Sequence, residues 1–209
     1  MKSTLMAAVA VAAMTGIASG DIVNGDFSNG AEGWQLFGGV QGPFGQDFFN
    51  GSDAVVAYGE FSGSVNYSGA TQNLGFSADG DYAEGDTINF GGQMYIEAGK
   101  ELYAGNNANI QLNFWYGNDY GFSVVAGTLD ASSLTDNLYS FDASYTLDAG
   151  AAQATRISFD FSYVQTDTPP DGVESGAAWG SNFYGNIVPA PGALALLGLA
   201  GLSGRRRRG

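Results

Sequence analysis

Residues 156–163 read Arg-Ile-Ser-Phe-Asp-Phe-Ser-Tyr, a strict alternation of polar and apolar side chains. Successive side chains of a β-strand point to opposite faces of the sheet, so this stretch has one apolar face and one polar face. Residues 87–98 and 110–116 alternate in the same way. The three segments therefore predict strands that turn one face to a hydrophobic core and the other face outward.

Shorter runs of the same kind extend in both directions, separated by Gly, Asn, Asp, Ser and Pro, while helical periodicity is almost absent between residues 21 and 187. We expect strands at residues 22–23, 34–40, 54–58, 70–76, 87–98, 110–116, 122–129, 139–147, 156–163 and 177–187. The pattern predicts an all-β domain, an antiparallel β-sandwich of the jelly-roll type.

Both ends of the chain differ from this domain in composition. Residues 1–20 hold Lys2, an apolar stretch and the small residues Ala18-Ser19-Gly20, which is typical of a secretory signal peptide cut by signal peptidase before Asp21. Residues 188–209 hold a Pro-x-Pro segment, an apolar run predicted to be a short helix, and four arginines. Basic residues after an apolar segment stay on the cytoplasmic side, so we expect the domain to lie outside a membrane that the tail contacts.

The order of features in this tail resembles the PEP-CTERM sorting tail. The residues that carry the resemblance are Val188, Pro189, Ala190, Pro191, Gly192, Arg205, Arg206, Arg207 and Arg208. The resemblance implies an exosortase-like membrane enzyme as partner, a transient or stable membrane anchor, and a final location at the cell envelope, the cell surface or outside the cell. Ala190 stands where that family has Glu, which leaves cleavage of the tail an open question.

The charge is distributed unevenly. All 21 acidic residues lie within residues 21–187, against only two basic ones, Lys100 and Arg156, so this part has a formal charge of −19. Such a charge repels nucleic acid and attracts divalent cations. The chain has no His and no Cys, which excludes Ser-His-Asp and Cys-His catalysis, thiolate or imidazole metal sites, and disulfides. We expect a protein that is not an enzyme.

The start of the domain carries a second resemblance. Residues 22–30 read Ile-Val-Asn-Gly-Asp-Phe-Ser-Asn-Gly and are followed by Gly33-Trp34. This opening is similar to that of galactose-binding-like, carbohydrate-binding jelly-roll modules. The resemblance implies a sugar-binding face and, in many such modules, a structural calcium ion. Ser28 replaces the Glu that helps to hold the calcium in that class.

Two groups of residues are candidates for binding. Sugars need aromatic rings for stacking with amides and carboxylates for their hydroxyls, and the polar strand faces supply these from Gln93, Tyr95, Gln111, Asn113, Trp115 and Asp160. Calcium takes oxygen ligands, and two clusters could offer them, Asn24 with Asp26 and Asp79 with Asp81 and Glu84. The alternatives are a half-buried Trp115 for the first group and a solvated turn for the acidic loop.

Together these features predict an exported, non-catalytic protein of the cell surface or extracellular matrix that binds or is embedded in polysaccharide. Two alternatives stay open. One is a structural surface protein that acts through calcium or protein contacts, and the other is a secreted glycan hydrolase that uses two carboxylates.

Overall fold

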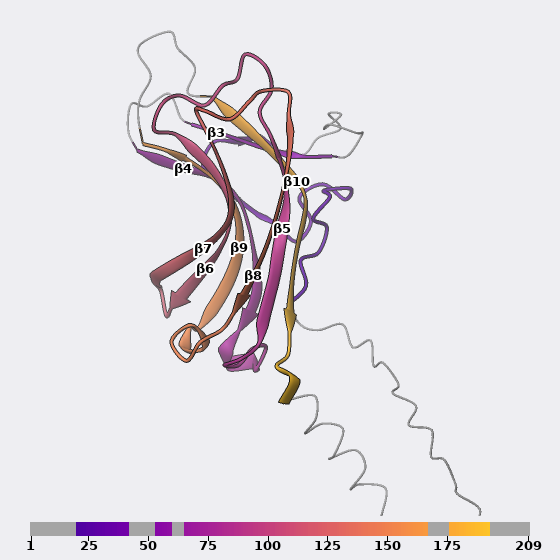
Figure 1. Ribbon diagram of the computed structural model, residues 1–209, viewed down its shortest axis with the longest axis vertical. Helices are drawn as coiled ribbons and strands as arrows, with labels where there is room; N and C mark the ends of the chain where they lie inside the picture. Colours follow the sequence, from indigo (N-terminus) through magenta and orange to yellow (C-terminus); the bar gives the residue numbers. More distant parts are fainter. Residues whose placement is uncertain (1–19, 42–52, 60–64, 167–175, 193–209) are drawn as a thin grey trace, which may run out of the picture.

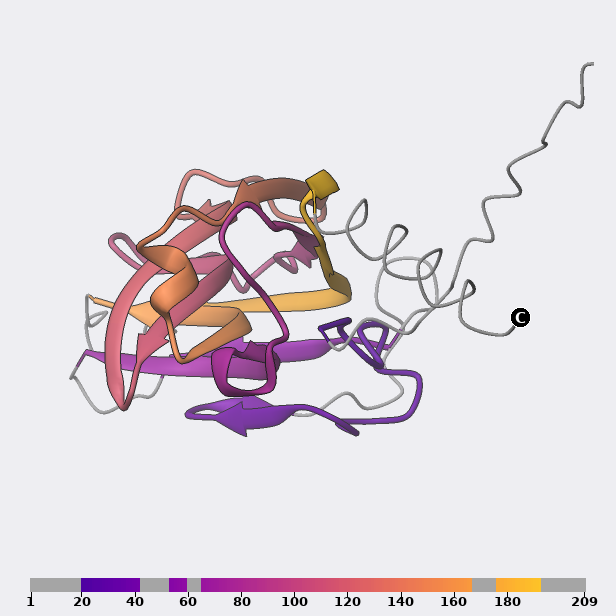
Figure 2. The ribbon, with the colours of Figure 1, turned by 90° about the horizontal axis from the view of Figure 1, so that it is seen from below.

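The computed structural model describes residues 20–41, 53–59, 65–166 and 176–192, which form two antiparallel five-stranded sheets packed face to face (Figures 1 and 2). In order of neighbouring strands, sheet A consists of β1 (Gln35–Phe37), β4 (Asn66–Phe76), β9 (Arg156–Gln165), β6 (Asn107–Tyr116) and β7 (Asp119–Asp130). Sheet B consists of β2 (Val40–Gln41), β3 (Val55–Tyr58), β10 (Ala177–Val188), β5 (Thr87–Tyr95) and β8 (Leu138–Thr146). Two short 3-10 turns, Ser77–Asp79 and Ala151–Gln153, complete the regular structure of the described residues. The predicted all-β sandwich is confirmed.

Two strand predictions at the start of the domain are wrong. Residues 22–23 form no strand: the Ile22 N–H donates to the Gly185 carbonyl (2.9 Å), but the chain turns away at Asn24, whose φ is +52°. The strand predicted at 34–40 is two strands in different sheets. The break falls at Gly38, where φ is +68° and a Cβ atom would lie 2.1 Å from the Tyr67 carbonyl oxygen. Only glycine fits this crossing from sheet A to sheet B.

The core lies between the sheets, where the alternation predicted from the sequence sends the apolar side chains. Ile157, Phe159, Phe161 and Tyr163 of β9 are fully buried, and so are the inward residues of β5 and β6. Strand β10 departs from simple alternation because a bulge after Ser181 shifts its register. The shift turns Phe183 into the core, where its ring packs against Trp34 and Phe159 at centroid distances of 5.6 and 5.3 Å. Gly92 and Gly180 leave room for this ring, since a Cβ atom on either would come within 2.4 Å of it.

The two ends of the described domain lie side by side. Gly20 lies so close to Ile187, near the end of β10, that a Cβ atom on Gly20 would come within 2.9 Å of the Ile187 side chain. Gly20 lies beside β10 of sheet B, and the described chain ends at residue 192, just after β10, toward the lower end of the molecule in Figure 1. The part of the chain with described coordinates contains no helix long and apolar enough to cross a membrane. The predicted signal peptide before Gly20 and the predicted apolar helix and arginines after Gly192 lie outside the described residues.

The Gly38 crossing yields a stability prediction. We expect Gly38→Ala to lower the free energy of unfolding by more than Gly30→Ala does. Both glycines have nearly the same φ (+68° and +66°), so both substitutions strain the backbone by about 1 kcal/mol. Only at Gly38 does the new methyl group also meet backbone atoms, whereas nothing lies within 4 Å at Gly30. Urea unfolding of the two variants measures the difference, and equal losses would contradict this account of the crossing.

Candidate functional site

The outer face of sheet A is hollowed into a groove of about 680 Å³. Figure 1 shows the sheet bowed, with its concave side to the left between β4 and β7. The groove is lined by residues from all five strands of the sheet: Gln35, Phe37, Tyr67, Thr71, Asn73, Gln111, Asn113, Trp115, Tyr120, Arg156, Ser158, Asp160, Ser162 and Val164. In β6 and β9 every second residue faces the groove, and the residues between them face the core.

Asp160, on the central strand β9, is the centre of the groove floor. Its side chain is only 7% exposed and accepts hydrogen bonds from both sides, from the Thr71 hydroxyl on β4 (2.6 Å) and from the Asn113 amide on β6. Burial raises the pKa of this carboxyl above its ordinary value, and the hydrogen bonds from Thr71, Ser158 and Asn113 together with the charge of Arg156 oppose that rise without cancelling it.

The hydrogen-bonded floor continues from Asn113 to the edge of the sheet. The Asn113 carbonyl oxygen accepts from the Gln111 amide (2.9 Å) and from the Ser123 hydroxyl (2.5 Å). Ser123 is in turn 2.7 Å from the Tyr120 hydroxyl on β7. Side chains of β4, β9, β6 and β7 are thus joined in one network, which fixes the direction of each donor and acceptor on the floor.

Trp115 and Arg156 form one end of the groove. The Arg156 guanidinium lies over the Trp115 ring, 4.5 Å from its centroid, and the indole N–H donates to the Ser158 hydroxyl (3.1 Å). Tyr120 meets Trp115 edge-on at 5.8 Å. Two buried polar atoms of the lining have no hydrogen-bond partner among the described residues, Nε of Arg156 and Oγ of Ser162. Such atoms are rare in folded proteins and are often explained by a missing ligand or water.

A second aromatic pair, Phe37 and Tyr67, lies at the diagonally opposite end. Tyr67 faces Val164 across the β4–β9 pairing, whereas Trp115 faces Arg156 across β6–β9. Arg156 and Val164 are eight positions apart in β9, which corresponds to about 26 Å of strand. Tyr67 and Tyr120 are 61% and 56% exposed, so their rings are available to a ligand in the groove.

The structure brings together four of the six predicted sugar-binding residues, namely Gln111, Asn113, Trp115 and Asp160. The other two, Gln93 and Tyr95, lie on β5 and point outward from sheet B, so the prediction of one shared surface is corrected. Gln93 donates to the Ser140 hydroxyl (3.2 Å), and the Tyr95 hydroxyl donates to Asp136 (2.7 Å). Burial, with the Asp136 contact, raises the pKa of Tyr95 to about 12.

Sequence reasoning missed the two exposed tyrosines of the groove and the role of Arg156. Tyr67 precedes residue 70, where its strand was predicted to begin, and Tyr120 precedes residue 122, the predicted start of the next one. Tyr67 continues the alternation of β4, which was the available signal, whereas a bulge between Tyr120 and Phe122 shifts the register of β7 and hides Tyr120 from such a pattern. The charge of Arg156 acts on Asp160.

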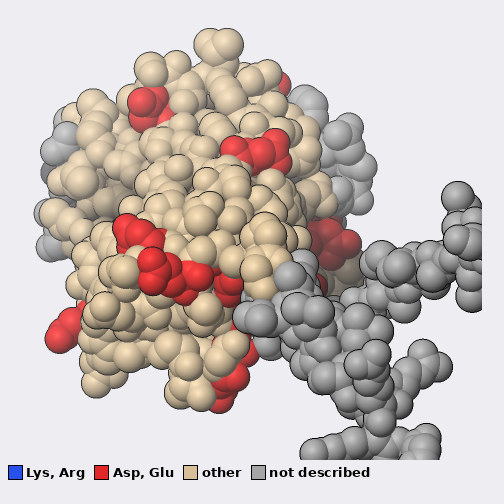
Figure 3. Space-filling view, turned by 60° about the horizontal axis from the view of Figure 1, so that its bottom comes forward, with Lys and Arg blue, Asp and Glu red and all other residues tan. Residues whose placement is uncertain are grey.

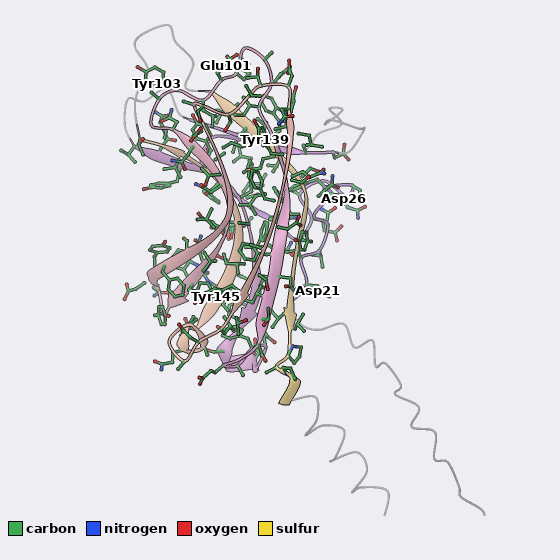
Figure 4. The ribbon with its side chains drawn as sticks, in the orientation of Figure 1. Asp21, Asp26, Glu101, Tyr103, Tyr139 and Tyr145 are labelled. Carbon is green, nitrogen blue, oxygen red and sulfur yellow. The ribbon has the colours of Figure 1, made fainter. Side chains whose placement is uncertain are left out.

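Three of the predicted calcium ligands accept hydrogen bonds from residues close to them in the chain. The Asn24 side-chain oxygen accepts from the Asn29 N–H (3.0 Å), Asp26 accepts from the Ser28 N–H and hydroxyl, and Asp81 accepts from the Phe76 N–H (2.9 Å). Figure 4 shows Asp26 across β10 from the concave face. Asp79 and Glu84 lie on the distant β4–β5 connection with Asp81. Among the residues with described coordinates, no three acidic side chains come together to hold a metal ion, and calcium stays a prediction.

Charge also sets the groove apart from the rest of the domain. Its lining holds one carboxylate, Asp160, and one cation, Arg156, although the domain is strongly acidic. Figure 3 shows acidic side chains spread over the lower end of the molecule, with no Lys or Arg visible among the described residues there. The groove is therefore a locally balanced surface on an acidic domain.

Comparison with known proteins bears on the fold. No family model matches the sequence, and no curated protein matches it. Among solved structures, the C-terminal family 22 carbohydrate-binding module of Clostridium thermocellum Xyn10B has 14% identity and a TM-score of 0.55, covering 82% of this chain and 95% of that one. The CBM22-2 xylan-binding domain of Paenibacillus barcinonensis Xyn10C has 12% identity and a TM-score of 0.52, covering 78% and 96%.

A third similar structure contains the CBM22-1 and GH10 modules of the Clostridium thermocellum xylanase 10B with xylohexaose, at 12% identity and a TM-score of 0.53, covering 83% of this chain and 29% of that one. At these identities the likeness concerns the fold. The chain has the β-sandwich fold of carbohydrate-binding modules.

Proposed function

We propose that the groove of sheet A binds a polysaccharide chain and that the protein is a binding protein without catalytic activity. The observation that carries the proposal is the combination of a fixed floor of amides, hydroxyls and one carboxylate with exposed aromatic rings at two opposite ends. Sugar rings present apolar C–H faces to aromatic rings and hydroxyls to polar groups, so a sugar chain matches both parts of this surface.

The size and charge of the groove support the same ligand class. The aromatic pairs are separated by about 26 Å along the strands, which suits an extended chain better than a single sugar. The balanced lining avoids the repulsion that the acidic domain exerts on anions.

Binding is favoured over hydrolysis by the number of carboxylates in the groove. Most glycoside hydrolases need two, held about 5–10 Å apart across the scissile bond. Asp160 is the one carboxylate of the described lining, and it is engaged by donors on both sides. The similar structures that are binding modules agree with this choice at the level of fold.

The wider role of the protein also belongs to the proposal. We infer that the chain is exported by its signal peptide, sorted through its C-terminal tail by an exosortase-like enzyme, and held at the cell surface or in the extracellular matrix beside polysaccharide. The support is the sequence of the two ends. The exit of the tail from sheet B, away from the groove, is compatible with glycan binding by an anchored domain.

The exposed rings yield a prediction about binding. Tyr67→Ala and Tyr120→Ala should each weaken binding of soluble polysaccharide about tenfold, which corresponds to about 1.4 kcal/mol. The reason is loss of a stacking surface at one end of the groove. Calorimetric titration against soluble xylan, β-glucan and mannan measures the effect. Tyr184→Ala is the matched control, because Tyr184 is a partly exposed tyrosine on the opposite sheet. Equal losses in all three variants would contradict the proposed site.

The buried carboxyl group of Asp160 yields a prediction about the pH dependence of stability. The raised pKa of Asp160 means that the folded protein holds the proton more tightly than the unfolded chain does. The contribution of this group to stability therefore falls as the pH rises from the ordinary pKa of an aspartate through the raised pKa of Asp160. Asp160→Asn removes that dependence. The free energy of unfolding of the variant minus that of the natural protein should therefore rise across this interval and then level off, as urea unfolding between pH 3.5 and 8 would measure. A flat difference would show that the floor does not desolvate the carboxylate.

A further inference from the structure

A second hollow, of about 600 Å³, adjoins the groove at the Val164 end, on the side of β7. We call it the corner pocket, and its polar lining comes from Asn106, Asn107, Asn109, Thr128, Asp130 and Ser132. It borders the groove directly, because Asn109 pairs with Ser162 and Asn107 pairs with Val164 across β6 and β9. Ser162 and Val164 both line the groove.

The chemistry of the corner pocket differs from that of the groove. Its lining contains no aromatic ring and consists of amides, hydroxyls and a carboxylate among small residues. Asn109 is fixed by a bond to the Asn107 side-chain oxygen (2.6 Å) and by one from the Thr128 hydroxyl (2.7 Å). This leaves the Asn107 amide nitrogen as a donor with no acceptor among the described residues.

The acceptor of the corner pocket stands next to this donor. Asp130 pairs with Asn107 across β6 and β7, so their side chains leave the sheet about 5 Å apart. Oδ1 of Asp130 accepts from the Ser132 N–H (2.8 Å) and hydroxyl (2.6 Å), which fixes the carboxylate in the lining of the pocket. A hydroxyl group is donor and acceptor at once, so neighbouring sugar hydroxyls match an amide beside a carboxylate.

The position of the corner pocket determines which sugar could reach it. The aromatic pairs, Trp115 with Tyr120 and Phe37 with Tyr67, stand at diagonal corners of the sheet. A chain that stacks on both pairs passes the corner pocket on its flank and does not enter it. We propose that the corner pocket binds a polar side-branch sugar of the polysaccharide whose main chain lies in the groove. This inference rests on the proposed function of the groove.

The test compares each main chain with and without its branches. The probes are arabinoxylan before and after enzymatic removal of arabinose, and galactomannan before and after removal of galactose, each titrated into the purified protein. We expect branch removal to weaken binding about three- to tenfold for at least one pair, the effect of losing one or two hydrogen bonds. Asn107→Ala should lower the affinity for the branched form to that for the debranched form and leave the latter unchanged.

Two variants separate the possible outcomes. Asn89→Ala, on the outward face of sheet B, is the matched control and should change neither affinity. Tyr67→Ala should weaken both forms alike. The branch site would be overturned if the natural protein bound branched and debranched glycan equally, or if Asn107→Ala weakened the binding of both forms equally. In either case the groove proposal would stand as long as Tyr67→Ala still weakened binding. No binding of any of the four glycans would overturn the groove proposal and the branch site together.

Discussion

The concave face of sheet A is organised around a carboxyl group buried in its middle, Asp160. A charged group out of water is tolerated only when donors surround it, and Asp160 draws these donors from β4, β6 and its own strand. Two of these donors are themselves held by further groups: Asn113 receives hydrogen bonds from Gln111 and Ser123, and the network reaches β7. Ser158, which donates to Asp160, also receives the indole N–H of Trp115 and thereby links the aromatic end to the centre.

The floor and the two ends of the groove differ in how their side chains are held. The amides and hydroxyls of the floor are committed to one another before any ligand arrives, so binding orders few additional side chains there. The exposed tyrosines at the two ends have fewer constraints, although Tyr120 keeps a hydrogen bond to Ser123. Under the proposed function, affinity for the sugar chain would come mainly from the exposed rings of Tyr67 and Tyr120. Discrimination among patterns of sugar hydroxyls would come from the floor.

The sequence predicted most of the fold because strands of this length reveal their faces through alternation. The predictions failed where one residue changes the direction of the chain, as at Gly38, and alternation could not reveal the bulge that turns Phe183 inward. The site was predicted less completely for a related reason. Alternation predicts that a side chain faces outward, but it does not reveal which of the two sheets carries it. Gln93 and Tyr95 were therefore grouped with Trp115, although the outer faces of the two sheets point in opposite directions.

The meeting of Gly20 and Ile187 at the edge of the sandwich has a mechanical consequence. A domain whose chain enters and leaves at one place is held at a single pivot, whichever of its two ends is attached to something else. It can turn about that pivot until its groove lies parallel to a fibre, without stretching or unfolding. Under the proposed function, many copies anchored to one surface could align with the same polymer, and their individual contacts would then combine into a durable attachment.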